Sequence, residues 1–460
     1  MERGYFLGAS SDGMINCVSK IPQSRAELWH VHLIPARGST MFSLKSIGRK
    51  RYARSVIPFT GGSAGGDPPS EQVQVDATSP WGPETLFQFK FYEGGKYALL
   101  TSSCKYLTSE GSCMDWVPVT AKANGHSNGV SITIKSAAVV PQLPPPECLF
   151  TIEYHGGNIA FRDCRGRYLA AAGRCAILRT RSNNVSRDEL FEFEPAPIQV
   201  AFRADFNNRY VSVKQGIDLS ANQGDITCNH ETFELEYNPK YDTWNIRSKV
   251  GNYWAPGAAS TIQASSHDKQ QAGFFRIKWN EDGTCSILAT DKMGQEGGEG
   301  SQKWVCARKS GQLCFSATDP VGFHVMLRNR RSLNLRPVHG SGFIGLKALG
   351  LGKLEANKTS PDSILIEYAN NDNTDDVTGT FNCCYFKMSG NNKYWSIVDG
   401  NTVAADSTSV TCAQQFQIEL RSGSSIAIRL FENCSYLNLS KQGSLILMNG
   451  GPNEATLWEF

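Results

Sequence analysis

The chain has 460 residues, of which 40% are hydrophobic, 10% aromatic and 19% charged. This composition is typical of a turn-rich globular protein and excludes a disordered chain or a coiled coil, and the length allows about two to four domains that each bury a core. The 46 Lys and Arg residues nearly balance the 43 Asp and Glu residues, so no global field would draw the whole molecule onto DNA or a membrane surface.

In chain order, a short closing strand with aromatic or apolar residues at alternate positions returns ten times. The copies are LWHVHL (28–33), LFQFKF (86–91), LFTIEY (149–154), LFEFEP (190–195), TFELEY (232–237), FFRIKW (274–279), GFHVML (322–327), ILIEYA (364–369), QFQIEL (415–420) and LWEF (457–460). Five of the nine spacings are 41 or 42 residues, and the longer ones coincide with polar or Gly/Pro-rich inserts. A fixed period of this length indicates a repeat architecture.

A second element lies between the closing strands: a turn with Gly or Asn, followed by a basic or small residue, an aromatic residue and an apolar residue. Examples are GRKRYA (48–53), GRYLAAAG (166–173), NRYVSVKQG (208–216), NKYWSIVDG (392–400) and CSYLNLSKQG (434–443), and only the unit around 285–314 is blurred. The period-two alternation predicts strands and the Gly, Asn and Asp residues predict turns, so each unit is an all-β element of about four strands.

Two β architectures accept a unit of this length, the propeller blade and the β-trefoil unit. A propeller would carry a recurring blade signature such as a WD dipeptide, whereas the single DW at 115–116 does not recur. The sequence therefore favours tandem β-trefoils, in which three units close around a pseudo-threefold axis. Counted back from the C-terminus, complete trefoils span 39–197, with long inserts, 198–327 and 328–460, and they leave residues 1–38 as an orphan unit.

Several motifs in the same order resemble fascin, a family of actin-bundling proteins. The resemblance rests on SIGRKRYA, GRYLAAAG with RDELFEFE, RYVSVKQGIDLSANQ with ETFELEY, GFIGLKALGLGKLEANK, NKYW and the terminal LWEF. It implies four β-trefoils, so this chain resembles a fascin that lacks the first two repeat units, with residues 1–38 as the third unit of trefoil 1. It also implies a monomer that holds filamentous actin in parallel bundles through separate basic faces, in the cytoplasm, the actin cytoskeleton and cell projections.

The most cationic turn, at Arg49, Lys50 and Arg51, has two interpretations. Charge runs are usually solvated hairpin faces, but the resemblance implies that these three residues contribute to an actin-binding face, accompanied by Arg54.

Other candidate actin-binding residues follow in the later trefoils. Arg209, Ser212 and Lys214 are expected to alternate along one strand and to point to one side. The resemblance implies an actin contact there and makes Ser212 a candidate phosphorylation site, where a phosphate would oppose binding to an acidic filament. It also assigns basic contact positions to Arg308, Lys309, Lys358, Lys393 and Lys441.

Other function classes find less support. We expect no enzyme, because HExxH, GxSxG and Walker A motifs are absent, and no metal or cofactor, because His30 and His32 have no visible third ligand. The fourteen cysteines form no CxxC pair and no signal peptide or membrane span is visible, which predicts reduced thiols in a cytosolic protein without membrane insertion. Nucleic-acid binding is disfavoured, and a lectin-like carbohydrate-binding trefoil remains the alternative.

Overall fold

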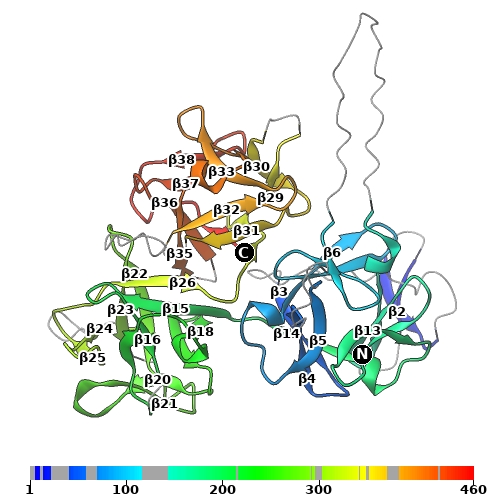
Figure 1. Cartoon of the computed structure of the whole chain (residues 1–460), viewed down its shortest axis with the longest axis horizontal. Helices are drawn as coiled ribbons and strands as arrows, with labels where there is room; N and C mark the ends of the chain where they lie inside the picture. The colour runs from blue at the N-terminus through cyan, green and yellow to red at the C-terminus, as the bar shows by residue number, and fades with distance from the viewer. Residues whose placement is uncertain are drawn as a thin grey trace, which may run out of the picture.

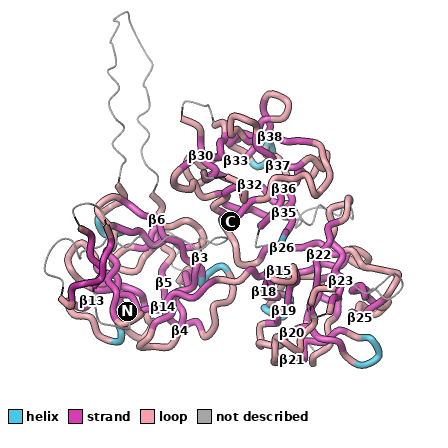
Figure 2. The backbone as a smooth tube through the Cα atoms, turned by 180° about the vertical axis from the view of Figure 1, so that it is seen from behind, coloured by secondary structure: helices cyan, strands magenta, loops and turns pink. Residues whose placement is uncertain are grey.

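The computed structural model describes residues 6–10, 14–21, 41–58, 70–116, 143–213, 216–291, 293–295, 303–340, 342–348, 352–369, 383–422 and 425–460. These residues form strands joined by turns and a few short 3-10 segments, as Figure 2 shows. No helix among them is long and apolar enough to cross a membrane. The closing strand predicted at 28–33, with His30 and His32, lies outside the described residues.

The middle part of the chain forms a closed six-stranded barrel, called the middle barrel. Its strands are β15 (Ile198–Ala204), β18 (Phe233–Asn238), β19 (Thr243–Ser248), β22 (Phe274–Trp279), β23 (Cys285–Thr290) and β26 (Phe323–Leu327). Each pairs antiparallel with the next, and β26 returns to β15, so the ring has no edge. Three hairpins are attached: β16 (Arg209–Ser212) with β17 (Ser220–Gln223), β20 (Tyr253–Pro256) with β21 (Ile262–Ser266), and β24 (Lys303–Ala307) with β25 (Leu313–Ser316).

The N-terminal barrel repeats this order. Its ring consists of β3 (Met41–Ser46), β6 (Leu86–Tyr92), β7 (Lys96–Thr101), β10 (Thr151–His155), β11 (Asn158–Arg162) and β14 (Phe191–Pro195), with β7 joined to the β10 region by the bridge from Tyr97 to Phe150. Its hairpins are β4 (Arg51–Val56) with β5 (Gln72–Ala77), β8 (Tyr106–Leu107) with β9 (Cys113–Met114), and β12 (Tyr168–Ala172) with β13 (Ile177–Ser182). Residues 6–19 add a separate hairpin, β1 (Phe6–Ala9) with β2 (Ile15–Ser19).

The C-terminal barrel differs in its first strand, which is split into β27 (Ser332–Leu333) and β28 (Arg336–Pro337). The ring continues through β31 (Ile364–Tyr368), β32 (Cys384–Met388), β35 (Phe416–Arg421), β36 (Ser425–Leu430) and β39 (Trp458–Glu459), and β39 returns to β28. Its hairpins are β29 (Phe343–Leu346) with β30 (Leu354–Lys358), β33 (Lys393–Val398) with β34 (Thr402–Ser407), and β37 (Tyr436–Leu439) with β38 (Leu445–Met448).

Short 3-10 turns begin most closing strands. These are η2 (Pro83–Thr85), η3 (Pro146–Cys148), η4 (Arg187–Glu189), η5 (Asn229–Glu231) and η7 (Val410–Cys412), while η6 (Ala258–Ser260) lies inside a hairpin. In η4 the buried Glu189 carboxylate accepts the backbone N–H of Ser186 at 2.9 Å, and Glu231 does the same for Cys228 at 3.1 Å. The carboxylates therefore satisfy backbone donors that would otherwise be buried without a partner.

The closing strands supply the barrel cores, as their alternation predicts. Each described closing strand contributes a side chain with 0% exposure: Phe87, Phe150, Phe191, Phe233, Phe275, Phe323, Ile364, Phe416 and Trp458. In the middle barrel the Trp254 ring meets Phe233 edge to face at a centroid distance of 5.1 Å, an arrangement that adds to the burial of apolar area. The prediction of an all-β chain of tandem β-trefoils is confirmed, because closed rings with three hairpins each are not propeller blades.

The three barrels lie next to one another (Figure 1), and hydrogen bonds join each pair of them. Gln199 Nε2 of the middle barrel donates to Pro80 O of the N-terminal barrel at 3.2 Å. Asn334 Nδ2 of the C-terminal barrel donates to Gln88 Oε1 of the N-terminal barrel at 2.7 Å. Trp279 Nε1 of the middle barrel donates to Leu420 O at 2.6 Å. Each barrel is thus held by the other two, which fixes their surfaces relative to one another.

Candidate functional site

One turn recurs at an equivalent place in all three barrels: the turn of the third hairpin, which packs on the first hairpin of the same barrel. In the middle barrel, Gly311 O accepts the N–H of Ala221 at 2.8 Å. Gly311 has φ +87°, and a Cβ there would lie 2.5 Å from Ala221 O, so this close approach requires glycine. The corresponding bonds join Val75 N to Ala176 O and Ala356 N to Gly443 O, both at 2.9 Å.

Each of these turns carries exposed cations. They are Arg174 in the N-terminal barrel, Arg308 and Lys309 in the middle barrel, and Lys441 in the C-terminal barrel. The fold therefore repeats a basic position at three separated places.

In the N-terminal barrel, the turn between β3 and β4 lies beside the turn of the third hairpin and adds further cations to it. Arg49 Nη2 donates to the carbonyl oxygens of Ala171 at 3.4 Å and Gly173 at 3.2 Å, directly before Arg174. Lys50 has φ +53° in the turn, and the side chains of Lys50 and Arg51 are exposed. Arg49, Lys50, Arg51 and Arg174 form what we call the N-terminal basic cluster.

Arg54 does not share the free charge of this cluster. Its Nε and Nη2 atoms donate to the two Asp76 carboxylate oxygens at 2.6 and 2.8 Å. This hydrogen bonding raises the pKa of Arg54 and lowers that of Asp76, so both groups stay ionised and neutralise each other.

In the middle barrel, two basic segments meet on β17. Arg209 Nη1 donates to Asn222 O at 3.3 Å, next to Ala221, which binds the 308–311 turn. Arg308 donates to Gln312 Oε1 at 3.0 Å and to Ala259 O at 2.8 Å, and Lys309 is exposed. Arg209, Arg308 and Lys309 form the middle basic cluster, and Lys214 lies outside the described residues.

The C-terminal barrel gathers its lysines less tightly. Lys441 is exposed in its turn, which packs on β30 through Ala356. Lys358, at the end of β30, is 28% exposed and pairs with Glu355 at 2.9 Å. Lys393 is the first residue of β33 and lies at the base of the β33–β34 hairpin. The other end of this hairpin contacts β38, through Thr402 and Ile446, so Lys393 lies away from that contact. Of the three candidate lysines of this barrel, Lys441 is thus the one that is exposed, whereas Lys358 and Lys393 are half-buried.

Comparison with known proteins shows what this chain is similar to. The model of the fascin domain matches residues 132–193 and 206–295. Fascin-2 of Bos taurus is 28% identical over 462 residues, which cover 99% of this chain and 78% of that protein. Fascin of Strongylocentrotus purpuratus is 27% identical over 403 residues, which cover 85% of this chain and 68% of that protein.

The chain is thus similar to fascins over nearly its whole length. Among solved structures, a mosquitocidal holotoxin matches with a TM-score of 0.26 at 11% identity, over 92% of this chain and 51% of the toxin chain. The designed three-fold symmetric protein ThreeFoil matches with a TM-score of 0.23 at 10% identity, over 34% of this chain and all of its own. Neither likeness is close enough to add to the similarity with fascins.

One expectation from the sequence is wrong: Arg209 and Ser212 do not form one exposed face. Arg209 is exposed, while Ser212 is 2% exposed and its Oγ donates to Asn222 Oδ1 at 3.0 Å. Residues three positions apart on a strand point to opposite sides. A kinase would reach Ser212 only after local opening of β16, so its phosphorylation stays a prediction.

Arg174 is the basic residue that sequence reasoning missed. Its turn, AAGRC, holds one arginine and no charge run. The signal that identifies it is positional: Arg174, Lys309 and Lys441 each lie two residues before the carbonyl that binds the first hairpin, in Ala176, Gly311 and Gly443.

The described residues hold no group of three or more His, Cys, Asp or Glu side chains that could bind a metal. All fourteen cysteines are free thiols. Burial raises the pKa of Cys306 to about 12 and that of Cys148 to about 12, so neither is a thiolate near neutral pH.

Proposed function

We propose that this chain binds actin filaments and cross-links them into parallel bundles through its separate basic clusters, without catalysing a reaction. The observation that carries the proposal is the repeated basic turn, which occurs on each barrel of a chain that is similar to fascins over nearly its whole length. A cross-linker needs at least two separate binding surfaces on one molecule, and an exposed basic turn on each of three barrels in mutual contact supports this role.

The charges fit this function. Actin filaments are acidic, and exposed ion pairs are individually worth only about 0.2–1 kcal/mol. Several weak clusters that engage neighbouring filaments together give a much larger avidity than any one alone. The formal net charge is only +3. Electrostatic attraction to an acidic filament must therefore come from these clusters and not from the protein surface as a whole.

The N-terminal and middle basic clusters are the two binding surfaces that we assign first. Lys441 is the third candidate. Lys358 contributes less, because its charge is already paired with Glu355. Lys214 and Lys393 remain candidates by family resemblance alone.

Co-sedimentation with filamentous actin at two speeds tests the proposal. High-speed centrifugation pellets single filaments with any bound protein, and low-speed centrifugation pellets only bundles. We expect the protein in both pellets. We expect Arg308→Glu/Lys309→Glu to reduce the low-speed pellet more than the high-speed pellet, because filaments can still bind the N-terminal basic cluster. Absence from both pellets would refute actin binding.

The proposal places the protein in the cytoplasm, on the actin cytoskeleton and in cell projections, acting as a monomer without nucleic acid or membrane insertion. A carbohydrate-binding role is the alternative for a trefoil protein, and no feature of the described residues favours it. Retention on immobilised sugars, together with absence from actin pellets, would reverse this preference.

A further inference from the structure

We propose that the junction of the three barrels binds a small organic phosphate, with the Arg328 and Arg330 guanidinium groups holding the phosphate. The site is independent of the basic clusters. It is built from the segment 327–331, which leaves the middle barrel and enters the C-terminal barrel, and from residues of all three barrels.

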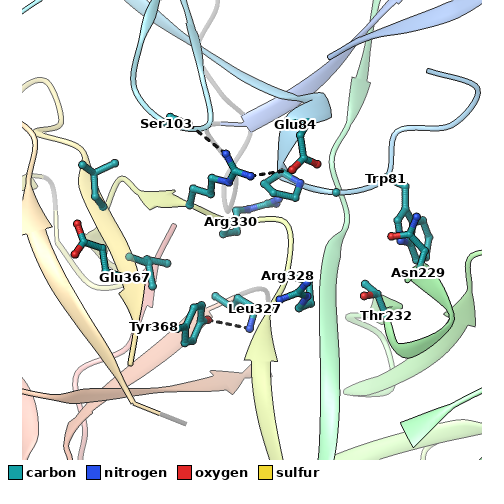
Figure 3. A pocket seen from close by; sticks show the side chains of 15 residues that line it. Trp81, Glu84, Ser103, Asn229, Thr232, Leu327, Arg328, Arg330, Glu367 and Tyr368 are labelled. Atoms are coloured by element: carbon teal, nitrogen blue, oxygen red, sulfur yellow. Dashed lines mark hydrogen bonds and ion pairs between the residues drawn. The ribbon is translucent and has the colours of Figure 1, made fainter. Parts of the chain in front are cut away.

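The cavity has a volume of about 590 Å³ (Figure 3). Trp81, Asn229 and Thr232 lie on one side of it, Glu367 and Tyr368 lie on the other, and Arg328 and Arg330 lie between them. Pockets that hold small ligands commonly measure about 300–1,000 Å³ and combine apolar walls with a few fixed polar groups. Leu327, Leu365 and Ile366 supply apolar wall here.

Three buried N–H donors at this cavity have no hydrogen-bond partner among the described residues: Arg330 Nη1, Arg328 Nε and Trp81 Nε1. Leaving such donors buried and unsatisfied is costly, and more so for charged groups. An anion that accepts from them would remove that cost.

Arg330 is the strongest indication of an anion. It is 4% exposed, donates from Nη2 to Ala196 O at 2.8 Å, and lies 5.9 Å from the centre of the Phe460 ring. Among the described residues its Nη1 has no hydrogen-bond partner, and burial lowers its pKa to about 10. A buried charge without a counter-charge is costly unless a ligand supplies one.

The carboxylates that line the cavity are already engaged. Glu84 pairs with Arg331 at 2.8 Å. Glu367 accepts the Tyr394 hydroxyl at 2.7 Å and lies 3.9 Å from Lys387. Neither is therefore the missing partner of Arg328 or Arg330, and both flank the site without neutralising it.

The shape and lining indicate the ligand class. Arginine prefers phosphate because its planar fork donates two parallel hydrogen bonds. Inorganic phosphate alone would leave most of the volume and the apolar wall unused. A ligand of about mononucleotide size, with a ring beside Trp81 and a phosphate at the arginines, fits both features.

Isothermal titration calorimetry on the full chain at constant ionic strength tests the site, with AMP, adenosine and inorganic phosphate as probes. We expect saturable binding of one AMP per chain, and binding of adenosine that is weaker by at least about tenfold because a charge-assisted bond is lost. Arg328→Gln should weaken AMP by about tenfold or more. Arg328 is the better variant because its only described side-chain hydrogen bond is from Nη1 to Met326 Sδ at 3.7 Å, whereas Arg330 also bonds Ala196 of the segment that joins two barrels.

Lys240→Gln is the matched control, since it removes an exposed charge from the middle barrel outside the cavity. It should bind AMP as the wild type does, and circular dichroism should show both variants folded. Equal losses in Arg328→Gln and Lys240→Gln would mean general attraction to cations and overturn the site. Equal binding of AMP and adenosine would overturn the phosphate assignment, and binding of inorganic phosphate but not AMP would overturn the organic ligand.

Discussion

Charge reversal of Lys50 and Arg51 is the sharpest perturbation of the N-terminal basic cluster. Both side chains are exposed, and neither holds the hairpins together. Arg49 is left in place because its guanidinium bonds two carbonyls of the third hairpin, and its loss would confuse a binding effect with a structural one. Lys50 keeps its φ of +53° in the glutamate variant, since glutamate and lysine share the same backbone preferences.

The expected loss follows from exposed ion pairs. Each reversal removes an attraction of about 0.5 kcal/mol and adds a repulsion of similar size. Two reversals therefore weaken filament binding by about 2 kcal/mol, or roughly 30-fold in Kd. The loss should shrink as salt rises, because the Debye length falls from about 10 Å at 0.1 M to about 3 Å at 1 M.

High-speed co-sedimentation across a range of salt concentrations measures this effect. Arg165→Glu/Lys240→Glu makes the same change in net charge at exposed positions outside the basic clusters, and should alter binding by less than about threefold. Equal losses in the two double variants would refute the site, as would a loss in Lys50→Glu/Arg51→Glu that does not depend on salt.

Three further predictions concern the fold. Gly311→Ala should lower the free energy of unfolding by about 2 kcal/mol or more, because its Cβ would meet Ala221 O at 2.5 Å. Gly443→Ala, with φ +79° and no atom within 4 Å, should cost about 1 kcal/mol, and equal urea midpoints would contradict the contact. Trp254→Ala should cost about 3–5 kcal/mol in thermal unfolding, since the side chain is 0% exposed; a loss under about 1 kcal/mol would show a loosely packed core. At pH 8, iodoacetamide should alkylate the exposed Cys164 long before Cys306, because burial raises the pKa of Cys306 to about 12. Equal alkylation rates of the two thiols, measured by mass spectrometry, would disprove the burial of Cys306.

The ring strands could be predicted from the sequence because their signal is local. Alternation around Phe233 and Phe275 encodes both a strand and the face that it buries. The repeat unit near 285–314 was not clearly recognised from the sequence, because a polar insert separates its first strand, β23, from β24. The position of such a hairpin depends on closure of the ring, and a short stretch of sequence carries no information on that closure.

The candidate site was less predictable, because it depends on contacts between distant segments. Arg49 meets the third hairpin across more than a hundred residues, so nothing near Arg174 in the sequence indicates that the two share a surface. The segment RNRRS shows three arginines alike. Only the packing of the barrels distinguishes the buried Arg330 from the exposed Arg331.

The reciprocal contacts among the three barrels also have a mechanical consequence. Gln199, Asn334 and Trp279 each bond across a different pair of barrels, which closes a triangle with no free hinge. A load applied to one barrel must shear two interfaces at once, so we expect the molecule to behave as a stiff strut. Two filaments held by its N-terminal and middle basic clusters would then slide past each other only by releasing a cluster, and the bundle would yield by detachment rather than by stretching of its cross-links.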